Sequence, residues 1–309
     1  MWRRYGWWLL LLVCLLALWV SSASRAGVRP EGCPAGCSTA GERREGPLRV
    51  MSLNMLHGFP HFEHLSTRMD LIADEIHRQD ADIVCLQEVP WTWQLGSGVE
   101  YVATRVGMNY VYVRANGNRR AILFEEGVAI LSRYRLEDTV AAELQPRAGF
   151  FEHRVALHAT AATAWGAVDV FVTRLTHGDQ EVNRQQATSL AAFVRTTGRA
   201  PAIVAGDLNA TEDSAQIQLL NQSWVDAFRV ANPDDEGLTC CIDNLASGPS
   251  EELEKRIDYL FVVPRGGRGV EVSRSQLALY RPFQAAHGWQ WASDHVGLLV
   301  EIEMAPSGT

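Results

Sequence analysis

The segment PAIVAGDLNATEDS, residues 201–214, joins a short buried strand to a polar turn. Residues 203–205 predict the strand, and Gly206 is expected to end it. Because residues i and i+2 face the same side of a strand, Asp207 and Asn209 should lie next to each other. The alternative is an Asx-turn, in which both side chains only bond the neighbouring backbone. The other strands of the chain decide between a functional pair and a simple turn.

Helix and strand signals alternate along the rest of the chain, which predicts a mixed domain of sheets covered by helices. Two alternating runs around the turn TAWG, HRVALHATA and AVDVFVTRL, predict an antiparallel pair of strands. Helices are predicted from the N-cap Thr67 onward and over 181–197, where Gly198 ends the second. Further strands are predicted over 48–53, 83–86, 127–131, 257–263 and 296–302.

Most of these strands begin or end next to a carboxylate, a carboxamide or a histidine. Each of these residues alone is most simply a cap, a turn or half of a surface ion pair, which contributes little stability. Together, at the ends of several strands, they predict an acidic pocket that contains two histidines. The residues are Asn54, Glu88, His177, Asp207, Asn209, Asp258, Asp294 and His295.

The overall composition limits the classes of function. The chain has 309 residues, 47% of them hydrophobic and 21% charged, which suits one large globular domain or two small ones. Its net charge is −8 and its isoelectric point is about 5.6. This acidic balance argues against a protein that holds nucleic acid through a broad basic surface. It is compatible with an enzyme that cleaves phosphate esters, because a bound divalent cation supplies positive charge locally.

Residues 1–26 have the outline of a secretory signal, with Arg3 and Arg4 first, an apolar run from Trp7 to Val20 and then mostly small residues. The run is shorter than the roughly 20 residues of a spanning helix, which favours export with cleavage after Ala23 or Ala26. We therefore expect a secreted or periplasmic protein. The alternative is an uncleaved N-terminal anchor that associates with a membrane outside the cytoplasm. The expected remainder is a linker over 27–47, one domain over 48–304 and a tail over 305–309.

The cysteines agree with an exported protein. Cys85 lies in a predicted apolar strand and is interpreted as a buried thiol. Cys33 and Cys37 are spaced to close a small loop. The adjacent Cys240 and Cys241 would form a strained bridge, because neighbouring Cα atoms lie about 3.8 Å apart. A zinc site is the alternative for these four residues, but their spacing matches no common zinc knuckle. We expect disulfides.

The ordered polar motifs resemble the endonuclease/exonuclease/phosphatase superfamily, and in particular its exported branches. The resemblance covers residues 48–304 and includes GVAILSR at 127–133 as a core strand. The chain differs at Leu208, where phenylalanine is frequent, and at Gly178, where leucine often follows Thr-His. The resemblance implies the pancreatic-deoxyribonuclease-like fold, an α+β class with two packed mixed β-sheets flanked by helices in a four-layer sandwich. The motifs are Asn54, Gln87-Glu88, Thr176-His177, Gly206-Asp207-Leu208-Asn209, Ile257-Asp258 and Ser293-Asp294-His295.

The resemblance also implies a Mg²⁺ or Mn²⁺ cofactor, held principally by Glu88 with Asn54 beside it. A hard cation of this kind prefers oxygen ligands and keeps some waters, so one or two carboxylates suffice. Asp207 would orient or deprotonate the attacking water, and Asn209 would hold the phosphate or that water. The polar pair that ends the opening segment would then be functional.

By the same resemblance, His177 and His295 contact phosphoryl oxygens as proton donors or as cations. A neighbouring carboxylate raises the pKa of a histidine and fixes its tautomer. We expect Asp258 to serve His177, and Asp294 to serve His295 or to add a metal contact.

These residues predict a metal-dependent phosphoesterase that hydrolyses a phosphodiester or a phosphomonoester with an activated water. The expected partner is a phosphate-ester substrate: a lipid headgroup, a small phosphodiester or a nucleic acid, because the fold alone does not decide the substrate. One alternative is an exported deoxyribonuclease-type endonuclease. Another is a non-catalytic binding domain on the same fold, although the complete polar set favours the enzyme. We expect a monomer.

Overall fold

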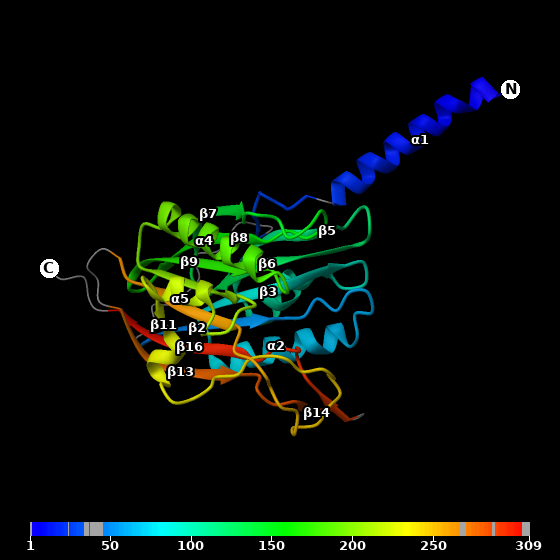
Figure 1. Ribbon diagram of the computed structural model, residues 1–309. Coiled ribbons are helices and arrows are strands. Elements are labelled where there is room, and N and C mark those ends of the chain that lie inside the picture. Colours follow the sequence, from blue (N-terminus) through cyan, green and yellow to red (C-terminus); the bar gives the residue numbers. More distant parts are fainter. Residues whose placement is uncertain are drawn as a thin grey trace.

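Two β-sheets pack face to face in the computed structural model, and helices cover the outer face of each (Figure 1). The structure describes residues 2–23, 25–33, 37, 46–265, 270–285 and 288–304. The expected tail and part of the expected linker lie outside these residues.

The strand order of each sheet places early and late parts of the chain side by side. The first sheet runs β1 (Glu31–Gly32), β5 (Asn109–Asn118), β6 (Phe124–Ser132), β3 (Ile83–Thr92), β2 (Leu48–Asn54), β16 (Gly297–Met304) and β13 (Val270–Ala278), with β4 (Gly96–Ser97) paired to β3. The second sheet runs β11 (Val225–Asp226), β12 (Asp258–Val263), β10 (Ala202–Asp207), β9 (Gly166–Arg174), β8 (Val155–Thr163) and β7 (Leu136–Glu143). A separate two-stranded sheet consists of β14 (Phe283–Ala285) and β15 (Gly288–Gln290).

Both sheets are mixed, because each contains one parallel pair among antiparallel neighbours. The parallel pair of the first sheet is β2 with β3, and that of the second is β9 with β10. Parallel strands end at the same edge, so each pair brings two strand ends together. The two edges lie at the same end of the sandwich, since Asn54 on β2 contacts Asp207 on β10.

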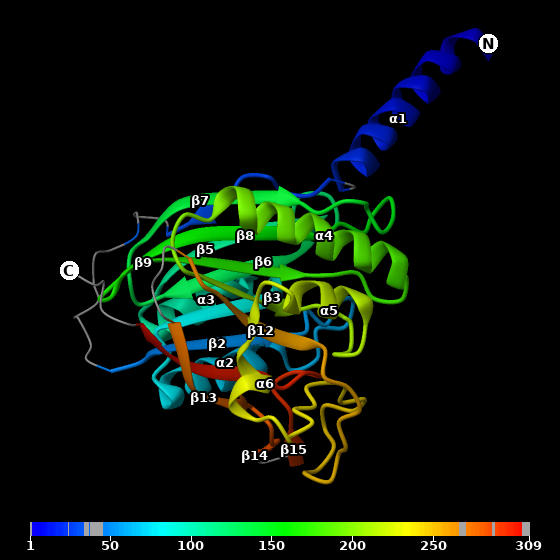
Figure 2. The ribbon, with the colours of Figure 1, turned by 60° about the vertical axis from the view of Figure 1, so that its left-hand side comes forward.

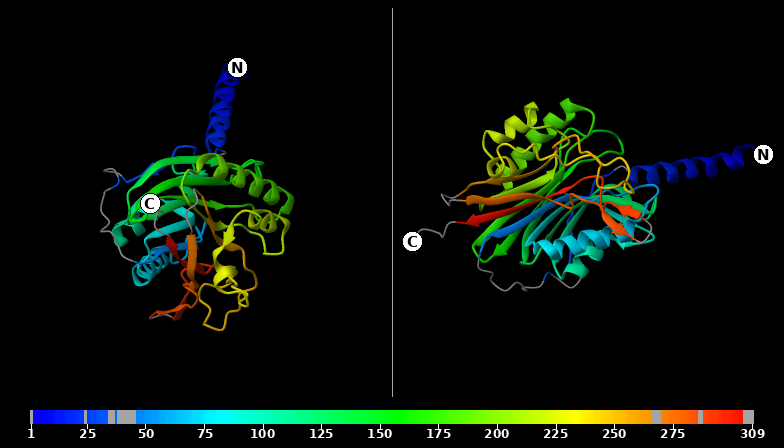
Figure 3. Two further views of the ribbon diagram at one scale, coloured as in Figure 1. Left: turned by 90° about the vertical axis from the view of Figure 1, so that its left-hand side faces the viewer. Right: turned by 90° about the horizontal axis from the view of Figure 1, so that it is seen from below.

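The helices form the two outer layers, which Figures 2 and 3 show from the side and from below. On the first sheet lie α2 (Leu65–Gln79) and α3 (Gly98–Val106), and on the second lie α4 (Gln180–Thr197) and α5 (Ala215–Asn221). The short α6 (Ala227–Ala231) packs against β12 and β13. The fold is therefore the expected α+β four-layer sandwich.

Three apolar layers hold the sandwich together. Side chains of both sheets meet between them, for example Val50 and Ile130 with Val172 and Leu260. The face predicted for the first helix, which includes Ile72, is buried against the first sheet. Leu190 and Val194 of α4 cover the second sheet in the same way. These fully buried side chains each contribute about 1.5–3 kcal/mol of transfer free energy.

The predicted strands and helices are present, with shifted ends. The antiparallel pair around TAWG is β8 with β9. The helix expected to start at the N-cap Thr67 begins at Leu65 instead, after His64, whose side chain makes no cap bond. The sequence prediction omitted β5, β7 and β13, whose polar or glycine-containing sequences carry a weak strand pattern.

Gly206 does not end its strand, contrary to the prediction. β10 continues to Asp207, and Gly206 pairs with Tyr259 on one side and Thr173 on the other. A Cβ atom at Gly206 would lie 2.1 Å from the carbonyl oxygen of Thr173. The glycine is therefore required by close packing against β9.

The N-terminal helix α1 (Trp2–Ala23) extends away from the sandwich (Figure 1). Its end approaches the β5–β6 hairpin, where Asn118 Nδ2 donates to the carbonyl oxygen of Ser22. Among the helices in the described part of the chain, none combines the length and apolar character needed to cross a bilayer.

Replacing Gly206 by alanine should lower the free energy of unfolding by about 1–3 kcal/mol, because the added methyl group forces β9 and β10 apart. Chemical denaturation measures this change. Gly149→Ala is the control, since a Cβ there would approach no atom closer than 3.7 Å. Equal stability of the two variants would contradict the close-packing argument.

Candidate active site

The strand ends of both sheets meet in one polar network. Asn54, the last residue of β2, donates from Nδ2 to Glu88 Oε1 and to Asp207 Oδ2, each at 3.1 Å. Its Oδ1 accepts the backbone N–H of Leu56 at 3.0 Å. The three network side chains are almost fully buried. Asn54 therefore orients two carboxylates that belong to different sheets.

Glu88 enters the network through an irregularity in β3. The strand was expected to end at residue 86, just before Glu88, but it continues to Thr92, and its register against β6 shifts between Leu86 and Val89. Glu88 itself has a φ of 53°, in the left-handed region. A bulge of this kind redirects a side chain next to a site. Here it aims the carboxylate at Asn54.

Glu88 keeps its negative charge despite its burial. Desolvation alone would raise its pKa, but the opposing charge of Arg174 and the bonds from Asn54 and His57 lower the pKa to about 2. Oε2 accepts the backbone N–H of His57 at 3.1 Å, and the His57 ring lies 3.5 Å away. His57 was not predicted as a site residue, and its position in a loop gave no periodic signal.

Asp207 and Asn209 satisfy both interpretations of the opening segment. The backbone N–H of Asn209 bonds Asp207 Oδ1 at 3.0 Å, which is an Asx-turn. The Asn209 side chain also donates to Asp207 Oδ2 at 3.0 Å, inside the network. β10 has ended before Asn209, whose φ is 49°. The turn, rather than strand alternation, therefore brings the two side chains together.

His177 stands at the exposed rim of the network. Its Nδ1 lies 3.1 Å from Oδ1 of Asn209. Since an amide oxygen only accepts, the Nδ1 of His177 carries a hydrogen in this contact. The expected partner Asp258 is not bonded to His177.

Asp258 pairs instead with His295, which corrects the predicted assignment. Asp258 Oδ2 and His295 Nδ1 lie 2.8 Å apart, and both side chains are buried. The physical reason is topology: Asp258 opens β12 directly opposite Asp207, facing the segment that leads into β16. Burial lowers the pKa of His295, but the Asp258 charge outweighs it and raises the pKa to about 10.

Asp294 is not the hydrogen-bond partner of His295. Its Oδ1 accepts from the Ser293 hydroxyl at 3.2 Å, and that hydroxyl also donates to the carbonyl oxygen of Asn54 at 2.6 Å. Burial and the Glu88 charge raise the pKa of Asp294 above its ordinary value, although His295 opposes them. Asp294 therefore lies close enough to Glu88 for the two carboxyl groups to interact.

Arg174 is the main site residue that the sequence analysis missed. It is the last residue of β9, and its guanidinium binds Glu88 Oε1 at 2.7 Å and Asp207 Oδ2 at 3.2 Å. The sequence did contain a pattern that could have identified it: Arg174 is a single cation at the end of an apolar strand, three residues before His177.

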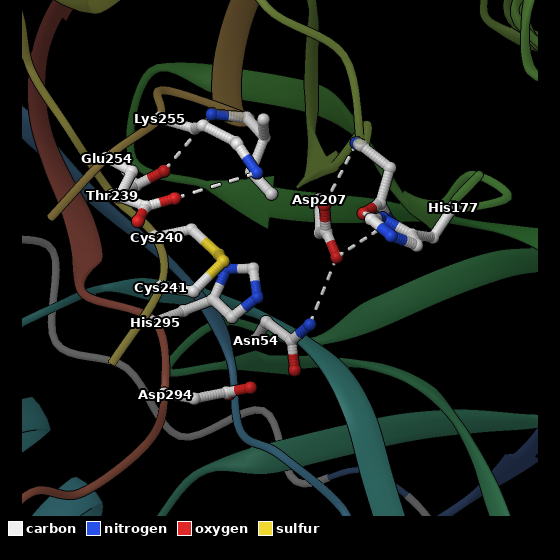
Figure 4. The surroundings of a disulfide bond; sticks show 12 residues. Asn54, His177, Asp207, Thr239, Cys240, Cys241, Glu254, Lys255, Asp294 and His295 are labelled. Carbon is white, nitrogen blue, oxygen red and sulfur yellow. Dashed lines mark hydrogen bonds and ion pairs between the residues drawn. A yellow bond between two sulfur atoms is a disulfide. The ribbon is translucent and has the colours of Figure 1, made fainter. Parts of the chain in front are cut away.

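A disulfide lies beside His295. Cys240 and Cys241 are bonded to each other, with Cα atoms 3.0 Å apart, and the backbone of Cys240 forms a β-bridge with His295. Figure 4 shows the disulfide next to the histidine ring, with Asn54 and Asp207 beyond it. The sulfur atoms of Cys33 and Cys37 lie 2.6 Å apart, so the structure brings this expected pair together.

The donor atoms fit a hard cation in their chemistry. Glu88 and Asp207 supply carboxyl oxygens, and Mg²⁺ needs only one or two carboxylates. Within the described ranges, no group of three or more His, Cys, Asp or Glu side chains is arranged to hold a metal. One feature differs from an open cation site: Arg174 binds an oxygen of each carboxylate.

Asp258→Asn should lower the pKa of His295 from about 10 toward or below its ordinary 6.5, because burial then acts without the opposing charge. The raised pKa stabilises the fold fully below about pH 6.5, and this contribution is lost as the pH rises to about 10. The variant should therefore lose stability at neutral pH, with a smaller difference near pH 10.

Histidine ring NMR across pH measures this pKa, and thermal melting measures the stability. Asp74→Asn, at an exposed position of α2, is the control and should leave the His295 titration unchanged. A His295 pKa near 10 in Asp258→Asn would contradict the pairing.

Comparison with known proteins identifies the family and the fold of this chain. A family model described as Endonuclease/Exonuclease/phosphatase family matches residues 51–295. No curated protein matches significantly. Among solved structures, a mannosyl-6-phosphatase of Bacteroides thetaiotaomicron is 19% identical, with a TM-score of 0.65 over 83% of this chain and 99% of that chain.

Two further solved structures show the same fold. A family protein of Bacteroides thetaiotaomicron is 18% identical, with a TM-score of 0.63 over 82% of this chain and 97% of its own. A D. rerio TDP2, humanised by 14 mutations, is 15% identical, with a TM-score of 0.64 over 83% of this chain and 98% of its own. Because the family model spans most of the sequence, the chain belongs to the endonuclease/exonuclease/phosphatase family.

Proposed function

We propose that this protein is an exported, monomeric, metal-dependent phosphoesterase that hydrolyses its substrate with an activated water. The observation that carries the proposal is the meeting of two units at one end of the sandwich. One unit is the carboxylate network of Asn54, Glu88 and Asp207, and the other is the Asp258–His295 pair. Family membership supports hydrolysis of a phosphate ester as the reaction class.

Asp207 is the residue we assign to the attacking water. Its carboxylate is fully buried and held by Asn54, Arg174 and Asn209, so its position is fixed before substrate binds. A water placed against it would lose a proton to the carboxylate as its oxygen bonds to phosphorus and the ester P–O bond breaks. Preorganised positioning of this kind lowers the barrier without reorganisation during the reaction.

The two histidines differ in their assigned roles. His295 is an imidazolium at neutral pH, because its pKa is about 10. Nδ1–H is held by Asp258, which leaves Nε2–H to donate to a phosphoryl oxygen and to stabilise the charge that develops on it. His177, at the rim, is oriented by Asn209 and would contact the phosphoryl group or the leaving oxygen from the solvent side.

A bound Mg²⁺ or Mn²⁺, held by Glu88 with Asn54 beside it and with Asp294 nearby, would supply positive charge to the phosphoryl and leaving oxygens. This assignment follows from the oxygen donors and from the retained charge of Glu88.

The edge of the site supports an ester with a ring or an apolar group. Phe59 is 47% exposed and stacks on Phe124 with ring centroids 4.6 Å apart. The His57 ring lies 5.2 Å from that of Phe124, so this aromatic wall borders Glu88. The candidate substrates are therefore a lipid headgroup, a small phosphodiester and a sugar phosphate. The similar mannosyl-6-phosphatase favours including phosphomonoesters.

Hydrolysis should require a divalent cation. We expect the purified protein to cleave at least one of bis-p-nitrophenyl phosphate, sphingomyelin, phosphatidylinositol, mannose 6-phosphate and DNA with Mg²⁺ or Mn²⁺. Excess EDTA should abolish the activity, and added cation should restore it. Undiminished hydrolysis in EDTA would exclude the metal assignment. Binding without turnover of any substrate would support a non-catalytic domain.

A double-mutant cycle should show that Asp258 and His295 act as one unit. His295→Ala should lower kcat by about 10²–10³, the usual cost of losing one transition-state donor. Asp258→Asn should reproduce part of that loss, and the double variant should cost less than the product of the two.

The control is a second double-mutant cycle, which combines His177→Ala with Asp258→Asn. These two side chains are not bonded, so their effects on kcat should multiply. If His177→Ala and Asp258→Asn were coupled, and Asp258→Asn and His295→Ala were independent, Asp258 would be the partner of His177 rather than of His295.

A further inference from the structure

Arg174 occupies the oxygens that a metal ion would need. Its Nη2 lies 2.7 Å from Glu88 Oε1, and its Nε lies 3.2 Å from Asp207 Oδ2. The Arg174 side chain is 20% exposed, so it is not sealed inside the protein. One cation thus bridges the proposed metal ligand and the proposed water-positioning carboxylate.

The hydrogen bonds of Glu88 leave little room for a second cation. Oε1 accepts from Asn54 and contacts Arg174, and Oε2 accepts the backbone N–H of His57. The backbone and the asparagine are fixed by β2 and the loop that follows it. Arg174 is the partner that a metal can replace, because its long side chain has other rotamers and a bound cation would supply the charge that Glu88 and Asp207 lose when the guanidinium leaves.

Charge gives a second reason for competition. A divalent cation at Glu88 would lie next to the guanidinium, and like charges at contact distance repel strongly in a buried site. A phosphoryl group is the opposite case, since arginine binds its oxygens in a planar two-point geometry. The same side chain is therefore excluded by the metal and attracted by the substrate.

We propose that Arg174 is an internal counter-ion that holds Glu88 and Asp207 until a metal and a phosphate ester bind together, and that it then moves to the phosphoryl oxygens. This inference rests on the proposed metal-dependent function. It makes metal and substrate binding cooperative, because substrate draws away the group that competes with the metal. By thermodynamic linkage, the metal must strengthen substrate binding by the same factor.

The first test is Mn²⁺ binding measured by titration calorimetry, without substrate. Arg174→Met keeps the length of the side chain and removes its charge, so Mn²⁺ should bind about tenfold tighter, within the usual range of coupling between sites. Arg174→Lys should give an intermediate affinity, because an ammonium group cannot bridge both carboxylates in the same way.

Arg154→Met is the matched control. Arg154 is also a buried arginine close to the site, but its guanidinium bonds Glu152 and the carbonyl oxygen of His153 rather than Glu88 or Asp207. Removing its charge should tighten Mn²⁺ binding much less. An equal gain in both variants would show a general charge effect and would overturn the proposal.

Inorganic phosphate serves as the probe for cooperativity. Phosphate should strengthen Mn²⁺ binding in the wild-type protein more than in Arg174→Met, because only the wild type gains by moving the arginine. An equal effect of phosphate in both proteins would also overturn the proposal.

Thermal melting keeps the test decisive if Arg174→Met folds poorly. Unpaired buried carboxylates should lower its Tm before metal is added, and saturating Mn²⁺ should restore more of the Tm than it adds to the wild type. An equal or smaller metal-induced rise in the variant would contradict the proposal. A wild type that neither binds Mn²⁺ nor hydrolyses any ester would instead refute the proposed function itself.

Discussion

The burial of two carboxylates, Glu88 and Asp207, is the constraint on which the functional end of this protein depends. An ionised group inside a protein is costly unless it is paired and hydrogen-bonded. Here the charges are met by Arg174, and the remaining lone pairs by Asn54, Asn209 and backbone N–H groups. Each of these partners sits at the end of a different strand or in the turn after one. The sheets must therefore keep their mutual position for the two buried carboxylates to keep these partners.

The architecture meets this constraint with a few local devices. Parallel pairing places the ends of β2 and β3, and of β9 and β10, at common edges. Gly206 allows β9 to approach β10 closely, and the bulge at Glu88 turns a strand side chain into the site. Opposite the carboxylates, Asp258 keeps His295 protonated. The site thus holds fixed negative charge on one side and a fixed cationic donor on the other, an arrangement suited to a phosphoryl group.

Much of this organisation was predictable from local patterns. Alternating and apolar runs indicated β2, β8, β9, β10 and β16, and helical periodicity indicated the buried face of α2. The polar residues at strand ends, taken as an ordered set, indicated the family and a common pocket, and the structure joins Asn54, Glu88, Asp207, Asn209 and His177 in one hydrogen-bonded network. The predicted ends of the strands were less accurate. The low strand propensity of glycine suggested a break at Gly206, although close packing against β9 requires a glycine inside the strand. The bulge in β3 depends on pairing with β6, which local patterns do not contain.

The sequence by itself determined which residue types stand at the strand ends, because strand and helix periods are local properties of the chain. Only the tertiary structure decided the partners. Asp258 bonds His295 rather than His177, and Arg174 reaches Glu88 across the two sheets. These contacts join residues 37 and 86 positions apart, counted as 295 − 258 and 174 − 88. The pairing of side chains that distant depends on sheet order and packing, since no short-range rule relates their positions.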